Sequence, residues 1–343
     1  MTRHNEFGCL PTAVGSMPHK DPVAACGEVV RHLPEIPAWP QLPARSALES
    51  QYFQFSEGFP GLTAADNRLC VDRSGSFDTE LERLYQAYLA KDYDCCPTSP
   101  DHAAGLHALL AWPDLAPIAV KGQITGPITY GLGISDKDQR PIIYDDTLAD
   151  ALAKFLHLKA AWQERALRKL ASHTIIFVDE PSMSYFGSAF ISLTRERVTS
   201  LLNEVFSGIS GVKGVHCCSN TDWPVLLQTD TDVVNFDTYG FAREFSLYPA
   251  EVAAFLKRGG VIAWGIVPNN ESSLLNETAN SLRDRLDEAM APFTRKGVPY
   301  RQLLEQALLT PSCSLAGLST EAASQALALL SELSHLIRRR RSL

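Results

Sequence analysis

Residues 174–181 read Thr-Ile-Ile-Phe-Val-Asp-Glu-Pro, a short apolar run followed directly by two carboxylates and a proline. β-branched and aromatic residues favour strands, and a strand that is buried on both faces is apolar throughout. Similar runs occur at 212–218, Val-Lys-Gly-Val-His-Cys-Cys, and at 233–237, Val-Val-Asn-Phe-Asp. Each is typical of a buried parallel strand that ends in residues able to carry chemistry.

Longer segments between such runs carry helical periodicity. Val198, Leu201, Leu202, Val205 and Phe206 follow the spacing of a helix with one buried face. Short strands that alternate with helices predict βα units and a parallel sheet. We count eight strands, which predicts an α/β fold of the (β/α)8 TIM-barrel type: Thr12–Gly15, Ile36–Trp39, Ile118–Lys121, Thr174–Val178, Val212–Val215, Val233–Phe236, Val261–Trp264 and Leu308–Thr310.

The segment from about residue 42 to residue 113 is too long for one βα connection and contains turn residues and a helical stretch, Thr79–Ala90. We therefore expect an insertion after the second strand, within a single barrel domain over residues 1–343. An open, doubly wound sheet stays an alternative, because periodicity does not distinguish it from a closed barrel. The glycine-rich motifs of nucleotide-binding folds are absent from the sequence.

Composition and charge restrict the class of protein. Lys and Arg total 31 against 39 Asp and Glu, a net charge of −8, and the one dense basic run lies at residues 338–341. This balance argues against nucleic acid as a partner. Without an apolar run of about 18 residues or a signal-peptide core, we expect no membrane span and a cytoplasmic protein. In a reducing compartment, the eight cysteines are buried thiols, redox groups or metal ligands.

The functional site of such a barrel lies at the carboxyl ends of its strands. His216 and Cys218 stand two residues apart at one strand end, so the pleat carries both to one side and Cys217 to the other. Asp237 follows the sixth strand and Cys313 the eighth. All four are ligand types that Zn²⁺ takes. The spacing fits a zinc site and also a buried cluster, because cysteine is among the most buried residue types.

Other strand ends carry further polar groups. Asp179 or its neighbour Glu180 is expected at the mouth of the cavity, where it can bind an amine, ligate a metal, act as a base or cap a loop. Gly15 and Ser16, before Met-Pro, offer backbone donors suited to a carboxylate but also form an ordinary turn. We interpret the adjacent Cys95–Cys96 as structural thiols.

Together these motifs resemble the catalytic domain of cobalamin-independent methionine synthase, in the superfamily that also contains uroporphyrinogen decarboxylase. The resemblance spans nearly the whole chain, with all motifs in family order. It rests on Val14–Pro18, Thr125–Thr129, Val178–Pro181, His216–Cys218, the run ending at Asp237, and Thr310–Cys313.

The resemblance implies a fold, an activity and a set of site residues. It implies four zinc ligands: His216, Cys218, Asp237, where the family usually has glutamate, and Cys313. It implies a binding site for the amino-acid group of homocysteine at Gly15, Ser16 and Asp179. Whether Glu49 or Gln51 binds the amine is not decided by the sequence. No catalytic residue beyond the zinc site is expected.

Two departures from the family bear on the methyl donor. The chain has room for one barrel, whereas the family's well-known members carry a second that contributes to folate binding. Residues 266–269 read Ile-Val-Pro-Asn where the family has His-Ser-Pro-Asn, so a histidine for proton handling is missing. We therefore predict methyl transfer to homocysteine from methylcobalamin or a methylated corrinoid protein, which forms methionine.

Several alternatives stay open at this stage. The donor can instead be methyltetrahydrofolate, and the acceptor can be another thiol such as coenzyme M. A zinc-stabilised protein that binds an amino acid or a corrinoid is an alternative of another class, as is a lyase like uroporphyrinogen decarboxylase.

Overall fold

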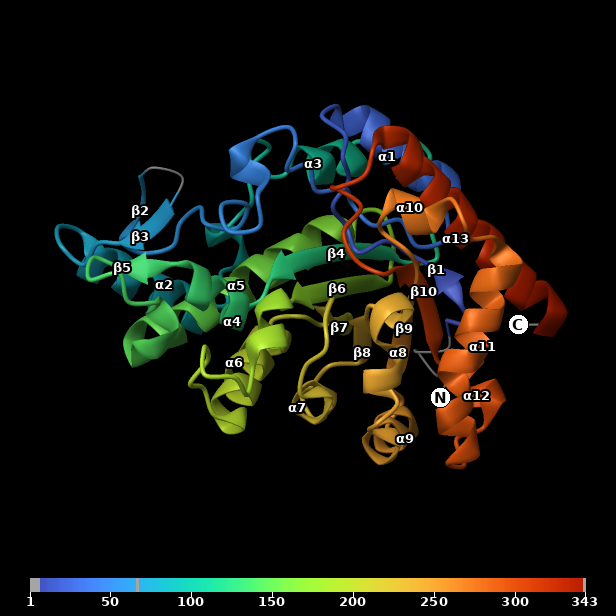
Figure 1. Ribbon diagram of the computed structural model, residues 1–343. Helices are drawn as coiled ribbons and strands as arrows, with labels where there is room; N and C mark the ends of the chain where they lie inside the picture. Colours follow the sequence, from blue (N-terminus) through green and yellow to red (C-terminus); the bar gives the residue numbers. More distant parts are fainter. Residues whose placement is uncertain (1–6, 66–67, 342–343) are drawn as a thin grey trace.

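The computed structural model describes residues 7–65 and 68–341, and its centre is a curled parallel sheet covered by helices (Figure 1). The sheet has seven strands in the order β1-β10-β9-β8-β7-β6-β4, and every neighbouring pair is parallel. The strands are β1 (Leu10–Pro11), β4 (Val120–Thr125), β6 (Thr174–Asp179), β7 (Val212–Cys217), β8 (Val233–Phe236), β9 (Val261–Val267) and β10 (Ala307–Pro311). The expected α/β fold with a parallel sheet is confirmed.

The first two predicted strands differ from the structure. β1 ends at Pro11, just before the predicted Thr12–Gly15. The predicted strand Ile36–Trp39 forms no strand. Within it, Ala38 makes a single bridge to Lys121 of β4, and just after it Gln41 makes a single bridge to Ser16. Prolines at 34, 37, 40 and 43 explain this difference, because a residue without an N–H cannot continue a ladder of hydrogen bonds.

Helices cover the outer face of the sheet. The five apolar residues that predicted a helix near 198–206 are all buried on α6. The helices outside the insertion are α1 (Pro22–His32), α4 (Pro127–Gly133), α5 (Asp146–Leu167), α6 (Arg195–Ser207), α7 (Trp223–Leu227), α8 (Thr238–Phe245), α9 (Pro249–Lys257), α10 (Glu271–Leu274), α11 (Ala279–Arg295), α12 (Tyr300–Glu305) and α13 (Thr320–Arg341), with short 3-10 turns η3 (Ile142–Tyr144) and η4 (Pro181–Tyr185). None of the helices in the described ranges is long and apolar enough to cross a membrane.

Strand residues alternate between two cores. On β6, Ile175 and Phe177 belong to a small inner core that the curled sheet encloses, whereas Ile176 and Val178 pack in the large core beneath the helices. The inner core draws residues from β1, β6, β8, β9 and β10, and Val212 of β7 packs against it. Because side chains alternate along a strand, the same periodicity carries Asp179 to the concave side, above the inner core.

The expected insertion is present between residues 42 and 113. It contains η1 (Ala47–Glu49), β2 (Leu62–Ala65), β3 (Arg68–Val71), α2 (Phe77–Ala90), η2 (Tyr93–Cys95) and α3 (Ala104–Leu110). The predicted helix Thr79–Ala90 lies within α2. β2 pairs with β3, and β3 pairs with β5 (Ser135–Asp136), which follows α4, in a separate three-stranded sheet at the left of Figure 1.

Candidate metal centre

Three of the four predicted zinc ligands lie together. His216 is near the end of β7, Cys218 follows that strand, and Cys313 follows β10. Their ligand atoms all lie within 4.8 Å of one another, and Cys313 Sγ is 3.7 Å from His216 Nε2. β8 and β9 separate β7 from β10 in the sheet, so it is the curl of the sheet that brings Cys313 back to His216.

A second residue, Asn235, orients the His216 ring. Asn235 Oδ1 lies 2.6 Å from His216 Nδ1, while its amide Nδ2 donates to Ala263 O and to Thr310 Oγ1, both at 2.8 Å. The Ala263 carbonyl fixes which end of the amide faces the ring, so Asn235 offers only an acceptor to Nδ1. In a neutral ring that carries its proton on Nδ1, the lone pair of Nε2 faces the cysteines, as a metal ligand requires.

The pKa values of Cys218, Cys313 and His216 favour the binding of a cation by these three residues. A hydrogen bond with Cys313, then one with His216, lower the pKa of Cys218 to about 4 despite burial. The same hydrogen bond and burial raise the pKa of Cys313. Burial alone lowers the pKa of His216, but hydrogen bonding to Cys218 and the charge of Asp179 outweigh it, so this pKa is raised. Cys218 is therefore a thiolate at neutral pH, the form in which cysteine binds metals.

Cys217 points away from the cluster, as the strand pleat predicts. Its side chain is buried in the outer core, and burial raises the pKa of its thiol to about 12. The other adjacent pair, Cys95 and Cys96, lies in the insertion with its two Sγ atoms 3.0 Å apart. Neither of them belongs to the ligand group formed by His216, Cys218 and Cys313.

The loop that carries Cys313 is held on both sides. Ser312 N donates to Val267 O at 2.7 Å, and its hydroxyl donates to Asn269 Oδ1 at 3.0 Å. The amide nitrogen of Asn269 donates to Ser314 O at 3.2 Å. Asn269, the last residue of the Ile-Val-Pro-Asn stretch, thus fixes the two neighbours of Cys313.

Asp237, the fourth predicted ligand, lies outside the group of three. It is the N-cap of α8, where its Oδ1 accepts a hydrogen bond of 2.8 Å from Gly240 N. Burial, and to a smaller extent the charge of Cys218, raise its pKa to about 6. The carboxylate of Asp237 is thus close enough for the charge of Cys218 to affect its pKa. Its role as a zinc ligand stays a prediction.

The two carboxylates after β6 have different environments. Asp179 stands opposite His216 in the register of β6 and β7, and its Oδ1 is buried without a hydrogen-bond partner in the described part of the chain. Burial raises its pKa to about 6, against the opposite effect of His216 and Lys121. Asp179 therefore offers a buried acceptor beside the metal ligands.

Glu180 is instead part of the scaffold. Its Oε1 and Oε2 accept hydrogen bonds of 2.8 and 2.7 Å from Ile128 N and Thr129 N, the unpaired amides at the start of α4. Burial raises its pKa to about 7.

The Gly15-Ser16 turn is packed tightly against β4. A Cβ on Gly15 would lie 2.7 Å from Gln123 and 2.9 Å from Gln41, so only glycine fits there. The Ser16 hydroxyl donates to Gln41 Oε1 at 3.0 Å. Buried Lys121 donates to Val14 O at 2.7 Å and to Gln123 Oε1 at 3.1 Å, which holds the chain just before the turn.

The sequence did not predict a role in the site for Asn235, Gln41, Lys121 or Gln123. A sequence signal existed for most of them, since a polar residue inside an otherwise apolar strand must find buried partners. The two further groups considered for the amine are placed differently. Glu49 is buried in an ion pair of 2.8 Å with Arg45, and the side chain of Gln51 is exposed.

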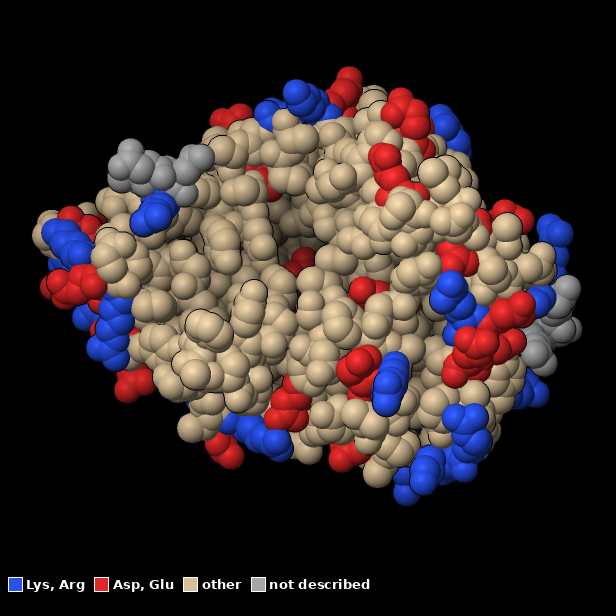
Figure 2. Space-filling view, in the orientation of Figure 1, with Lys and Arg blue, Asp and Glu red and all other residues tan. Residues whose placement is uncertain are grey.

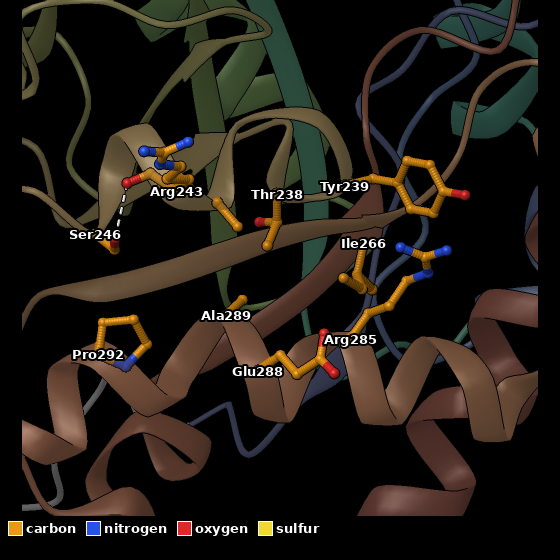
Figure 3. Close-up of a pocket in the computed structure, with 10 residues that line it drawn as sticks. Thr238, Tyr239, Arg243, Ser246, Ile266, Arg285, Glu288, Ala289 and Pro292 are labelled. Carbon is orange, nitrogen blue, oxygen red and sulfur yellow. Dashed lines mark hydrogen bonds between the residues drawn. The ribbon is translucent and has the colours of Figure 1, made fainter.

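The space-filling view shows a deep hollow in the middle of one face, with acidic side chains inside it (Figure 2). A separate cavity of about 290 Å³ lies between α8 and α11 (Figure 3). It is on the outer side of β9, because Ile266, which lines it, belongs to the outer core. Its other lining residues are Thr238, Tyr239, Ala242, Arg243, Ser246, Arg285, Glu288, Ala289 and Pro292.

Solved structures resemble this chain over nearly its whole length. The chain is similar to a B12-independent methionine synthase from Shewanella sp. W3-18-1 in complex with selenomethionine, with 16% identity, a TM-score of 0.55, and coverage of 96% of this chain and 98% of that one. The chain shares the fold of the B12-independent methionine synthases. A candidate synthase of the same type from Listeria monocytogenes gives 16% identity, a TM-score of 0.56, and coverage of 95% and 96%.

The chain is also similar to a methyltransferase from Methanosarcina mazei at 12% identity, with a TM-score of 0.52 and coverage of 94% of each chain. No protein-family model matches the sequence, and no curated protein matches it either. The likeness in sequence is thus low, while the likeness in fold covers nearly the full length.

Proposed function

We propose that this protein is a zinc-dependent methyltransferase that forms methionine by transferring a methyl group to homocysteine, from methylcobalamin or a methylated corrinoid protein. One juxtaposition carries the proposal. The three soft ligands His216, Cys218 and Cys313 cluster beside Asp179, whose buried oxygen has no partner among the described residues. We take the curled sheet, together with the segment at residues 36–41 that makes single bridges to it, to be a single (β/α)8 barrel domain.

Each residue has a defined task in this proposal. His216, Cys218 and Cys313 hold the zinc ion, with Asp237 as the proposed fourth ligand. Zinc, when bound, stabilises the thiolate form of a substrate thiol, which is its nucleophilic form. Asp179 accepts hydrogen bonds from the ammonium group of homocysteine.

The carboxylate of homocysteine would lie against the Gly15-Ser16 turn. A backbone turn offers N–H donors, and the hydroxyl of Ser16 is held near by Gln41. The amino-acid group would then be fixed at two points, so that the thiol is directed to the metal centre. Such positioning is a large part of the rate enhancement that enzymes achieve.

The residues at 266–269 favour a corrinoid donor over a folate. An amine leaving group such as that of methyltetrahydrofolate needs a proton, and this stretch contains no histidine. A corrinoid leaves without protonation. Methyltetrahydrofolate is therefore the second-choice donor.

Each alternative function does not account for one observed feature of the site. A thiol acceptor that lacks an amine, such as coenzyme M, leaves the Asp179 carboxylate unpaired. A lyase of the uroporphyrinogen decarboxylase type gives the His216, Cys218 and Cys313 cluster no task. A closed structural zinc site with a third thiolate is ruled out, because the Cys217 side chain is buried in the outer core.

The test is methyl transfer from free methylcobalamin to homocysteine by the zinc-loaded protein. The loss of methyl from the corrinoid is followed by absorbance, and methionine is identified by mass spectrometry. Cys313→Ser is the matched negative control. If the zinc-loaded protein forms no methionine from either methylcobalamin or methyltetrahydrofolate, the proposal fails.

A further inference from the structure

We infer that Asn235 is a positioning residue that selects the Nδ1–H tautomer of His216 and so presents Nε2 to a thiophilic metal ion. The inference rests on the proposed zinc site but concerns a residue that is no ligand. It assigns to Asn235, on β8, an effect on the affinity for the metal ion in addition to that of the three ligands.

The first step is the placement of Asn235. It is fully buried on β8 and stands opposite His216 in the register of β7 and β8. Because inward side chains of paired parallel strands lie side by side, the amide meets the ring directly. The distance of 2.6 Å between Oδ1 and Nδ1 is short for a hydrogen bond between an N–H group and an oxygen.

The second step is the direction of that hydrogen bond. Asn235 Nδ2 has two acceptors, Ala263 O and Thr310 Oγ1, on the neighbouring strands β9 and β10. A rotated amide would point its oxygen at Ala263 O and lose that hydrogen bond, whereas the Thr310 hydroxyl can donate or accept. A buried group without a partner costs about 1–3 kcal/mol. The orientation is therefore locked, and only an acceptor faces His216.

The third step is the consequence for the metal centre. A neutral histidine carries one proton, and a proton on Nε2 would point toward Cys313 Sγ, 3.7 Å away, where the metal ion would bind. Asparagine removes that tautomer without adding charge. A hydrogen-bond partner on the other ring nitrogen of a metal-binding histidine typically accounts for about 10–100-fold in metal affinity.

The experiment compares Asn235→Leu, which has no acceptor, with Asn235→Asp, which keeps one. Thr310→Val is the matched control, since it removes one anchor of the amide and leaves Ala263 O. Zinc affinity is measured by competition with a chelator, the Co²⁺ absorption spectrum reports the ligand set, and ¹⁵N NMR of the metal-free protein reports the tautomer of His216.

We expect Asn235→Leu to weaken zinc binding about 10–100-fold and to lose the Nδ1–H preference, whereas Asn235→Asp stays within a few-fold of wild type. Thr310→Val should keep the tautomer. A purely structural role predicts instead that zinc affinity falls in all three variants in proportion to their loss of thermal stability, and this result overturns the inference.

The wild-type protein provides a test that does not depend on the folding of any variant. An Nε2–H tautomer in its metal-free form, measured at a pH high enough for the His216 ring to be neutral, overturns the inference outright. The proposed function fails in a different way, either through a wild-type protein that does not bind zinc, or through one that binds zinc and forms no methionine.

Discussion

Asp179→Asn should stabilise the metal-free protein while it damages substrate binding. The carboxylate is held with one oxygen buried and without a partner among the described residues, and burial raises its pKa from an ordinary 3.8 to about 6. The folded protein thus pays a free-energy penalty for ionising Asp179 that the unfolded chain does not. A neutral amide of the same shape removes this penalty.

The size of the effect follows from the pKa shift. A difference of about two pKa units corresponds to about 3 kcal/mol, and partial exposure of the side chain reduces this to about 2 kcal/mol. Because the folded pKa is the higher one, the penalty is absent below pH 3.8, grows as the pH rises, and is complete above pH 6. The gain in Asp179→Asn is therefore full at pH 8 and roughly half as large at pH 5.

The assay is thermal or urea unfolding of the wild type and Asp179→Asn at pH 5 and pH 8, with a chelator present. At pH 8 the melting temperature should rise by about 4 °C. Zinc should shrink the difference, because a cation near Asp179 stabilises its ionised form. A difference between the two proteins that does not change with pH would refute the reasoning. Under assay conditions the same variant should raise KM for homocysteine at least tenfold and leave use of a simple thiol unchanged.

Three further predictions concern the ligands and their scaffold. Cys313→Ser should lose zinc and methyl transfer together, whereas Cys217→Ala should keep stoichiometric zinc, as measured by metal analysis of the purified proteins. Glu180→Leu should lower the free energy of unfolding by about 3 kcal/mol in urea titrations, because both backbone N–H groups at the start of α4 then lose their acceptors; an unchanged midpoint contradicts this. Gly15→Ala should cost about 1–3 kcal/mol through its contact with Gln123 and raise KM for homocysteine, and a variant with wild-type KM and stability would show that the turn adapts.

Much of the fold follows from local patterns in the sequence. The apolar runs at 174–178 and 212–215 form strands because β-branched residues fill a sheet that is buried on both faces. The spacing of the apolar residues in α6 likewise predicts this helix correctly. The segment at 36–39 failed as a strand because its prolines, not its apolar residues, set the local structure. The pairing of β5 with β3 could not be predicted, because it joins segments about 65 residues apart through a few hydrogen bonds.

The sequence by itself determined the types of residue at the strand ends, and the two-residue pleat explains why Cys218 joins His216 while Cys217 does not. Only the tertiary structure decided which strand ends meet. The curl of the sheet brings Cys313 within 3.7 Å of His216 Nε2 and leaves Asp237 as the cap of α8. It also assigned Asn235 to the ring of His216, since a contact between neighbouring strands depends on register. β7 and β8 are parallel and joined by a crossover rather than a tight turn, so no turn type in the sequence fixes their register.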